Sequence, residues 1–336
     1  MNELSSPHTC SACGGAIRTL RDFGPQPLTN YFPAHGDESV RFHPLILGAC
    51  SECAIVQLCD PCPPERLKPP RPMRYNEPEG HLDALVDEVV ALPGVSPRSR
   101  ICGLTYKEST TLERFHQRGF LQVTELSSSA DFQITDASAG LETIQARITP
   151  GVADALVERH GTFDVVLVRH LLEHSHDLTN FLAAVRRLAA TDGYIIFEVP
   201  DCTTMFSVTD YSFLWEDHIS YFTPTTLART LRQHRLHPQQ MLTYPYALEN
   251  SLVAITSRNH ASPSGGELPG TSSIDRYAAS FPHIRDMWTQ KLTELKQQGP
   301  IAILGAGHLA VTFINLLGVE PLIDYVCDDA ADKVNR

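Results

Sequence analysis

Residues 163–200 read FDVVLVRHLLEHSHDLTNFLAAVRRLAATDGYIIFEVP, and this stretch decides the fold class. Its first part, Phe163–Val168, is a short run rich in β-branched residues, which is typical of a buried strand. Apolar residues then recur at helical spacing over Asp177–Ala190, and a second apolar run, Tyr194–Val199, follows. A strand, a helix and a strand in this order predict a right-handed crossover in a largely parallel sheet.

The same alternation extends in both directions, so residues 74–258 are predicted to form one α/β domain. Before the central stretch we expect a helix over Gly80–Leu92, strands at Arg100–Leu104 and Phe120–Thr124, and a helix over Thr149–His160. After it come strands near Met241–Tyr246 and Ser251–Thr256. These last two lie close enough in sequence to pair antiparallel at the edge of the sheet.

The ends of the chain have a different character. Residues 1–73 are rich in Cys and Pro and show no helical period, which predicts a small domain held by a metal. A linker rich in Ser, Gly and Pro is expected over 259–273. Residues 274–336 predict a helix and then one βαβ crossover around Gly305-Ala306-Gly307. A single crossover leaves faces of its sheet uncovered, so we expect this partial C-terminal lobe to be incomplete or to rest on the preceding domain.

Composition limits the function classes. The chain has 336 residues, 42% of them hydrophobic, and a formal net charge of −12. This acidic balance argues against nucleic acid as a partner, because neutralising phosphates requires clustered Lys and Arg. No run of about 18 apolar residues is present to cross a membrane. Met1 to Pro7 is polar and does not resemble a signal peptide, so we expect a cytoplasmic protein.

Two C-x-x-C pairs, Cys10/Cys13 and Cys50/Cys53, predict a structural zinc site. Four thiolates form the tetrahedral set that structural zinc prefers, and they leave no open position for catalysis. A third pair, Cys59 and Cys62, allows three interpretations. It could replace one of the first pairs, serve a second site, or simply pack in the protein interior, and we favour packing.

Several motifs together resemble the zinc-binding front of the sugar C-methyltransferases. They are the first C-x-x-C, Phe23-Gly24, Pro27-Leu28-Thr29-Asn30-Tyr31-Phe32, and Cys50-Ser51-Glu52-Cys53 followed by Val56-Gln57-Leu58. The resemblance continues through Val168–His174 with Asp177-Leu178, and through Gly193 to Pro200, which are similar to the class I methyltransferase segments around strands four and five. It implies a seven-stranded class I methyltransferase-like domain, structural Zn²⁺, and S-adenosylmethionine (SAM) as the methyl donor.

The resemblance also implies site residues. Glu125 follows the second predicted strand, where an acidic side chain can accept both hydroxyls of the SAM ribose, and ligands of open α/β sheets bind at the carboxyl ends of strands. Gly103 and His170 stand at the ends of two further strands, and we expect both to border the cofactor. His174 belongs at the same edge.

Members of this family are thought to remove a proton beside the ketone of a nucleotide-linked 4-keto deoxysugar, after which the carbanion attacks the sulfonium methyl group. His218, within Trp215-Glu216-Asp217-His218, matches the proposed histidine base, and imidazole titrates near working pH. Asp217 and His174 would orient the substrate or stabilise the enolate. Tyr75 resembles a family tyrosine on the segment that enters the cleft.

One segment departs from the family pattern. The first strand should run into a glycine-rich turn, because the cofactor approaches the backbone closely there. This chain has Gly103-Leu104-Thr105-Tyr106-Lys107-Glu108-Ser109, in which only Gly103 matches. Three interpretations follow: a divergent SAM-dependent methyltransferase, a sugar-nucleotide-binding protein whose Lys107 meets phosphate, or an inactive relative. We favour the methyltransferase.

The C-terminal turn allows one more hypothesis. Gly305-Ala306-Gly307-His308-Leu309-Ala310 has the G-x-G-x-x-A pattern of a dinucleotide site between a strand and a helix. Asp324, Asp328 or Asp329 would then hold a ribose, and the protein would be an oxidoreductase. We rank this below the methyltransferase, because the family resemblance accounts for the same residues as part of a lobe on the substrate side.

Overall fold

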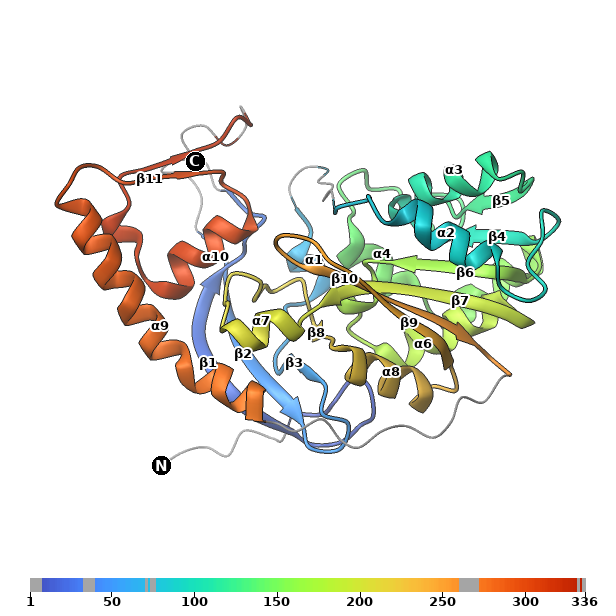
Figure 1. The fold of residues 1–336 in the computed structure, drawn as a ribbon, viewed down its shortest axis with the longest axis horizontal. Helices are drawn as coiled ribbons and strands as arrows, with labels where there is room; N and C mark the ends of the chain where they lie inside the picture. Colours follow the sequence, from blue (N-terminus) through green and yellow to red (C-terminus); the bar gives the residue numbers. More distant parts are fainter. Residues whose placement is uncertain are drawn as a thin grey trace.

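The computed structural model describes residues 8–32, 40–69, 72, 77–259, 272–330 and 333. Figure 1 shows a large α/β unit on one side, a small lobe formed by the C-terminal residues on the other, and the N-terminal strands between them. Tyr75 and most of the predicted linker lie outside the described residues. Within the described part of the chain, every helix is too short or too polar to cross a lipid bilayer.

The central sheet has six strands among the described residues. In spatial order they are β5 (Gln122–Glu125), β4 (Arg100–Gly103), β6 (Phe163–Arg169), β7 (Ala189–Asp201), β10 (Asn250–Ser257) and β9 (His237–Tyr244). The first four run parallel, while β10 is antiparallel to both β7 and β9. The predicted crossover and the antiparallel pair at one end are therefore confirmed.

The prediction of seven strands was wrong for the described residues. The missing strand would follow β5, where the chain instead forms turns between Leu126 and Gly140. Ser and Asp side chains cap these turns, as in the bond from Ser127 N to Asp131 Oδ2 at 2.8 Å. Phe132 and Ile134 are nevertheless buried. Local side-chain bonds of this kind compete with a sheet ladder, so the segment covers the core without forming a strand.

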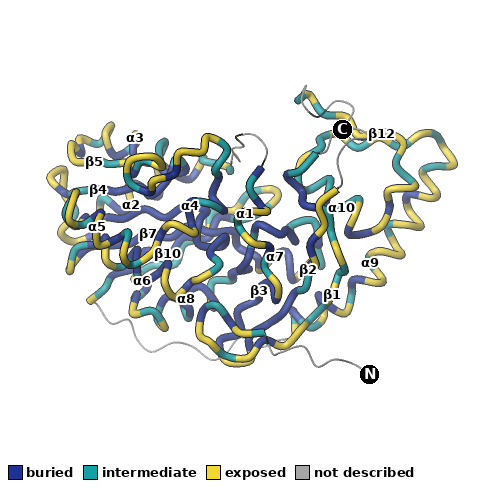
Figure 2. Tube along the Cα trace, turned by 180° about the vertical axis from the view of Figure 1, so that it is seen from behind, coloured by how far each residue is buried: buried dark blue, intermediate teal, exposed yellow. Residues whose placement is uncertain are grey.

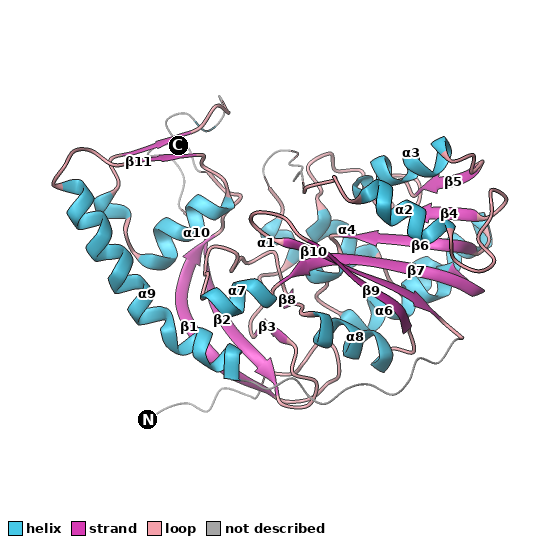
Figure 3. Cartoon of the chain, viewed as in Figure 1, coloured by secondary structure: helices cyan, strands magenta, loops and turns pink. Residues whose placement is uncertain are grey.

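Helices cover both faces of the sheet, as Figure 3 shows in cyan against the magenta strands. They are α2 (Leu82–Val90), α3 (Ser109–Gln117), α4 (Leu141–Arg147), α5 (Pro150–His160), α6 (Leu178–Leu188) and α8 (Pro224–Gln233). Side chains of β6 alternate between two apolar cores: Val166 and Val168 meet α4, α5, α6 and α8, whereas Val165 and Leu167 meet α2 and α3. Both faces are thus buried, as a parallel sheet requires.

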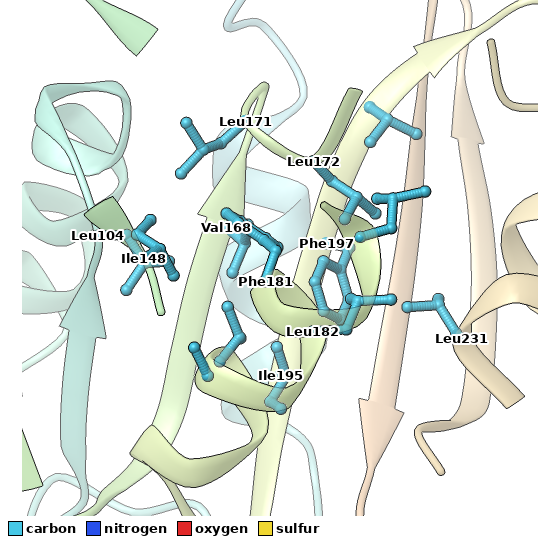
Figure 4. Close-up of a cluster of buried hydrophobic side chains, with 14 of the residues drawn as sticks. Leu104, Ile148, Val168, Leu171, Leu172, Phe181, Leu182, Ile195, Phe197 and Leu231 are labelled. Atoms are coloured by element: carbon cyan, nitrogen blue, oxygen red, sulfur yellow. The ribbon is translucent and has the colours of Figure 1, made fainter. Parts of the chain in front are cut away.

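The packing of α6 shows why the central stretch folds as it does. Figure 4 shows Phe181 and Leu182 against Val168 of β6 and Phe197 of β7. All four side chains are at most 1% exposed. The helix begins at an Asp177 cap whose Oδ1 accepts from Asn180 N at 2.9 Å. Burying each large apolar side chain contributes about 1.5–3 kcal/mol, so this contact is a major source of stability.

The N-terminal residues form a second, antiparallel sheet that sequence periodicity did not predict. Its strands are β1 (Ile17–Pro27), β2 (Phe42–Cys50), β3 (Val56–Leu58) and β8 (Ser220–Tyr221). The last strand comes from far along the chain, because Ser220 and Tyr221 pair with Gln57 and Val56. A helical turn, α1 (Pro64–Leu67), follows β3, and α7 (Thr203–Val208) follows β7. The segment that carries His218 therefore supplies the last strand of this N-terminal sheet.

The C-terminal residues form the predicted helix and βαβ crossover. These elements are α9 (Ser272–Lys296), β11 (Ala302–Leu304), α10 (His308–Leu317), a short 3-10 helix η3 (Glu320–Leu322) and β12 (Tyr325–Cys327). Strands β11 and β12 pair in parallel, and α9 and α10 pack beside β1. Figure 2 shows the outer lobe largely in yellow and teal, unlike the dark blue central strands. Leu304 and Tyr325 are exposed.

Candidate active site and zinc centre

The four predicted cysteine ligands meet in one group. Their sulfur atoms all lie within 4.8 Å of one another. Cys10 Sγ is 3.7 Å from Cys53 Sγ, and Cys13 Sγ is 3.5 Å from Cys50 Sγ. These distances are too long for a disulfide bond of about 2.05 Å. They suit a tetrahedral zinc ion, for which sulfur atoms at about 2.3 Å from the metal stand about 3.8 Å apart.

Each cysteine pair sits in a tight turn that aims its sulfur atoms at the same point. Gly14 and Ala54 follow the two pairs and have φ values of +74° and +63°. Gly14 N donates to Cys10 O at 2.9 Å, and Ala54 N donates to Cys50 O at 3.0 Å. The left-handed conformation is costly for alanine, so the second turn is one that the surrounding structure enforces. The donor set and its geometry fit structural zinc.

The third cysteine pair does not join this group. Cys59 and Cys62 are both buried, and burial raises the pKa of their thiols to about 11 and about 12. Cys62 packs with Leu28 and Leu67. Both thiols are buried and lie outside the group of four sulfur atoms, which supports the packing role that the sequence favoured.

A cavity of about 500 Å³ opens between the large unit and the start of α10 in the C-terminal lobe. Its volume is that of a small-molecule site. The walls come from the ends of β6 and β7, the loop between β9 and β10, and the start of α10. The lining residues are Glu77, Pro78, Leu141, His170, Glu173, His174, Pro200, Phe213, Trp215, His218, Tyr246, Ala247, Leu248, Glu249, Asn250, Ser251, His308 and Leu309. The cavity therefore lies at the carboxyl edge of the parallel strands.

Two predicted residues, His174 and His218, meet at this wall together with Glu173. Glu173, His174 and His218 place their polar atoms within 4.8 Å of one another, and the rings of His174 and His218 have centroids 4.9 Å apart. His174 Nδ1 donates to Asp217 O at 2.8 Å, which leaves Nε2 as the acceptor of the neutral ring. Burial lowers the pKa of His174, and burial with neighbouring cations lowers that of His218 well below its usual range. Both rings are neutral bases at pH 7.

Glu173 supplies the negative charge beside them. Its side chain is 1% exposed, and neither carboxylate oxygen accepts a hydrogen bond from the described residues. Its nearest charge is His170, whose Nδ1 lies 3.5 Å from Glu173 Oε1. This cation lies close enough to balance the carboxylate, and a neutral imidazole beside the pair can accept a proton.

Residues that follow strand β1 in the N-terminal sheet hold the His218 segment in place. Trp215 Nε1 donates to Thr29 Oγ1 at 2.5 Å, and Thr29 N donates to Glu216 Oε1 at 2.6 Å. Asn30 Nδ2 donates to Asp217 Oδ2 at 3.1 Å. The Thr29-Asn30 motif and the His218 motif, far apart in sequence, thus form one structural unit.

Asp217 was predicted to orient the substrate or stabilise the enolate, but its side chain does not face the large cavity. Its carboxyl group is buried against Asn30 and is absent from the lining of the large cavity. Burial and the charge of Glu216 raise the pKa of Asp217 well above its usual range. Its main-chain oxygen, which orients His174, is the atom that reaches the site.

His170 is held by strong charges. Its backbone has a φ of +47°, which is uncommon outside glycine, and its Nε2 lies 3.2 Å from Glu198 Oε1. Burial opposes its positive charge, yet Glu173 and Glu198 outweigh burial and raise the pKa to about 10. His170 therefore lines the cavity as a cation.

Glu198, which the sequence did not single out, organises this wall. It is fully buried, and its carboxylate accepts from Arg169 Nε at 2.5 Å and from Ser251 Oγ at 2.7 Å. His81 Nε2 lies 3.0 Å from the same group. Burial opposes its charge, but Arg169 and the two histidines hold its pKa well below the usual range. The one sign of this role in the sequence is that a Glu interrupts the apolar run Tyr194–Val199, which is predicted to be a buried strand.

The segment after β4 forms a short 3-10 helix, η1 (Tyr106–Glu108), instead of a glycine-rich turn. Glu108 Oε2 accepts from Thr105 N at 2.7 Å, while its Oε1 accepts from Arg169 N at 2.6 Å. A Cβ atom on Gly103 would stand 2.6 Å from Glu108 Cβ. Gly103 is thus required to make room for Glu108, which ties β4 to β6.

The remaining predicted cofactor residue stands at the edge of this segment. Glu125 ends β5, pairs in register with Gly103, and is exposed. Its Oε2 accepts from Ser109 Oγ at 2.5 Å. Lys107, in η1, forms an ion pair with Glu77 at 2.5 Å. Glu77 in turn lines the cavity, and nothing in the sequence indicated this pairing.

Comparison with known proteins agrees with this description. A family model described as "Methyltransferase domain" matches residues 82–237, and one described as "Putative zinc binding domain" matches residues 10–67. The C-methyltransferase NovU of Streptomyces niveus is 25% identical over 235 residues. The match covers 68% of this chain and 55% of NovU, so the chain spans about half the length of that relative.

Solved methyltransferase structures show a weaker likeness. Magnesium protoporphyrin IX methyltransferase from Synechocystis, with bound S-adenosylhomocysteine, is 14% identical with a TM-score of 0.38, covering 54% of this chain and 83% of that one. A 1,6-didemethyltoxoflavin-N1-methyltransferase from Burkholderia thailandensis is 15% identical with a TM-score of 0.34, covering 53% and 77%. Likeness at this level supports no argument about the site.

The sheet, its helices and the matching model define a class I methyltransferase domain preceded by a zinc-binding domain. With this pair of domains, the chain is similar to the C-methyltransferase NovU.

Proposed function

We propose that this protein transfers a methyl group from SAM to the carbon beside the ketone of a nucleotide-linked deoxysugar. The two domains and the similarity to a C-methyltransferase support the reaction class. The substrate class follows from the family that the sequence motifs resemble. The cavity between the large unit and the start of α10 has the volume of a small-molecule site, and its wall carries charged side chains that suit a polar ligand.

The observation that carries the proposal is the neutral His218 in the cavity wall. A general base must be unprotonated at working pH and must face the substrate. His218 lines the cavity, and burial together with the positive charges of His170 and Lys107 lowers its pKa. Trp215 packs beside its ring, with centroids 4.8 Å apart, which fixes the ring's direction.

In the proposed reaction, His218, His170 and Glu173 each have a separate role. His218 accepts the proton from the carbon beside the ketone, and the electron pair of that C–H bond remains on the substrate as an enolate. The cationic His170 lowers the energy of this negative charge from across the wall. SAM supplies the methyl group, whose bond to sulfur breaks as the new C–C bond forms, so the sulfur leaves as a neutral thioether. Glu173 then balances the protonated His218.

The residues at the strand ends fit such a donor. Glu125 is exposed at the end of β5, where its carboxylate can accept the ribose hydroxyls. Gly103 and His170 border the same edge. Asp217 contributes by orienting His174 through its main-chain oxygen. Tyr75 lies outside the described residues, and its role stays a prediction from the family resemblance.

Hydrogen exchange tests the base without requiring methyl transfer. Nucleotide-linked keto-deoxysugars are incubated in D₂O with the zinc-loaded protein and S-adenosylhomocysteine, and deuterium at the carbon beside the ketone is measured by NMR. We expect exchange with the parent and with His237→Ala, a change on the outer strand β9. His218→Ala should abolish it while keeping the fold. Equal exchange in His218→Ala contradicts the assignment.

A second candidate rests on the departure at Lys107. A protein that binds a sugar nucleotide without methylating it would use this lysine for phosphate. The charge of Lys107 is already matched by Glu77, so a phosphate would bring an unmatched negative charge to this pair. Tight binding of a sugar nucleotide, combined with no binding of S-adenosylhomocysteine, would nevertheless establish it.

A further inference from the structure

The buried ion pair between Lys107 and Glu77 is a feature that the proposed reaction does not yet use. Lys107 Nζ lies 2.5 Å from both carboxylate oxygens of Glu77. The lysine side chain is 4% exposed and the glutamate side chain 25%. Burying such a pair costs desolvation that its attraction often fails to recover, so its presence at a strand end calls for a reason other than stability.

The pair stands between the two parts of the proposed SAM site. On one side, Ser109 Oγ donates to Glu125 and also to Tyr106 O at 2.8 Å, so the ribose carboxylate adjoins the turn that carries Lys107. On the other side, Glu77 lines the cavity that holds His218. A donor whose ribose sits at Glu125 and whose methyl group faces His218 must extend past this pair.

The charges of the pair complement an α-amino acid. The amino acid end of SAM carries one carboxylate and one ammonium group, and the pair offers one ammonium and one carboxylate. Burial favours neutral Lys107, but Glu77 keeps it paired, and the charges of His170 and Lys107 lower the pKa of Glu77 against the effect of burial. Arg169 Nη1 donates to Lys107 O at 2.6 Å and fixes its backbone.

We propose that Lys107 and Glu77 bind the amino acid end of the methyl donor, with the lysine on its carboxylate and the glutamate on its ammonium. This inference rests on the proposed function. When the amino acid end of the donor binds, the Lys107–Glu77 pair is replaced by two ion pairs, one from each residue to the ligand. The ligand end is a zwitterion, so the site gains no net charge. The lysine in place of a glycine-rich turn is then a recognition group rather than an obstacle to a sulfonium.

The test compares two ligands that differ only at this end. S-adenosylhomocysteine carries the amino acid, whereas 5′-methylthioadenosine keeps the adenosine and the thioether without it. Both are titrated by calorimetry into the full, zinc-loaded chain. We expect the first to bind the parent protein at least about 100-fold more tightly, as the loss of charge-assisted hydrogen bonds implies. Equal affinities overturn the inference with no variant involved.

A paired substitution locates the effect. Lys107→Met with Glu77→Gln removes both charges together, which avoids leaving one buried and unpaired. It should weaken S-adenosylhomocysteine by about 100-fold and leave methylthioadenosine within about threefold, which also shows that the variant is folded. Lys296→Met with Asp324→Asn removes a matching ion pair in the C-terminal lobe and should change neither ligand.

The outcomes separate this inference from the proposed function. Unchanged S-adenosylhomocysteine binding in the Lys107/Glu77 variant overturns the inference and leaves the methyltransferase standing. An equal loss of both ligands in that variant also overturns it, because the effect would not be confined to the amino acid end. A parent protein that binds neither ligand removes the proposed function itself.

Discussion

Replacing His170 by asparagine should change how stability depends on pH, because His170 is a buried cation between two carboxylates. Its pKa is raised from the usual 6.5 to about 10, since Glu173 and Glu198 outweigh burial. A group whose pKa is raised on folding contributes stability in full below its unfolded pKa. That contribution is lost as pH rises toward 10. At about 1.36 kcal/mol for each pH unit, it is on the order of 5 kcal/mol.

Urea unfolding between pH 7 and 10 measures the effect. The free energy of unfolding of the parent should fall by several kcal/mol relative to that of His170→Asn across this range. Buried acids with raised pKa values, such as Glu216 at about 7, titrate in both proteins and cancel in the difference. His237→Asn is the matched control and should follow the parent. A constant difference between the parent and His170→Asn at all pH values would refute the argument.

Three further changes test other parts of the structure. Cys50→Ser should lower the zinc content measured by atomic absorption and melt the N-terminal sheet, and a variant with full zinc and an unchanged melting temperature would contradict the metal site. Thr29→Val leaves Trp215 Nε1 buried without its acceptor and should lower the free energy of unfolding by about 1–3 kcal/mol. Thr225→Val, on an exposed position of α8, should change it by less than about 0.5 kcal/mol, and equal effects would remove the special role of Thr29. Glu125→Ala should weaken S-adenosylhomocysteine by about tenfold or more in calorimetry, and unchanged binding would show that the ribose lies elsewhere.

Features set by local pattern were predictable from the sequence. The alternation around Phe163–Val199 fixed the parallel strands and their helices, because each apolar face must be covered. The two C-x-x-C pairs likewise revealed the zinc centre, since their spacing has few other uses. The N-terminal sheet was missed. Its strand β1, IRTLRDFGPQP, contains Gly and Pro and shows two register shifts, so it lacks the clean alternation of a typical strand.

Features set by distant pairs could not be predicted. Thr29 contacts Glu216 across 187 positions, and β8 pairs with β3 although all four parallel strands lie between them in the sequence. The pairing of Lys107 with Glu77 and the network around Glu198 also depend on tertiary contacts. Polar residues in such networks show no period along the chain, and each looks like an ordinary surface residue until the fold brings its partner close.

The Thr29-Asn30 motif and the His218 motif, which both resemble the same family, contact each other in the structure. The sequence presented the Thr29-Asn30 motif and the His218 motif as separate similarities to one family. The structure shows the first holding the second through Trp215 and Glu216. The cysteine cluster also contacts the large unit, since Ala12 O, between two of its cysteines, accepts from His234 Nε2 at 2.8 Å at the end of α8.

The most direct measurement is methyl transfer with SAM labelled in its methyl group. The zinc-loaded protein is incubated with labelled SAM and nucleotide-linked keto-deoxysugars, and the products are analysed by mass spectrometry and NMR. We predict one labelled methyl group on the carbon beside the ketone with the parent protein. His218→Ala should give none, while still binding S-adenosylhomocysteine. Label on an oxygen, or equal labelling by His218→Ala, would contradict carbon methylation with His218 as the base.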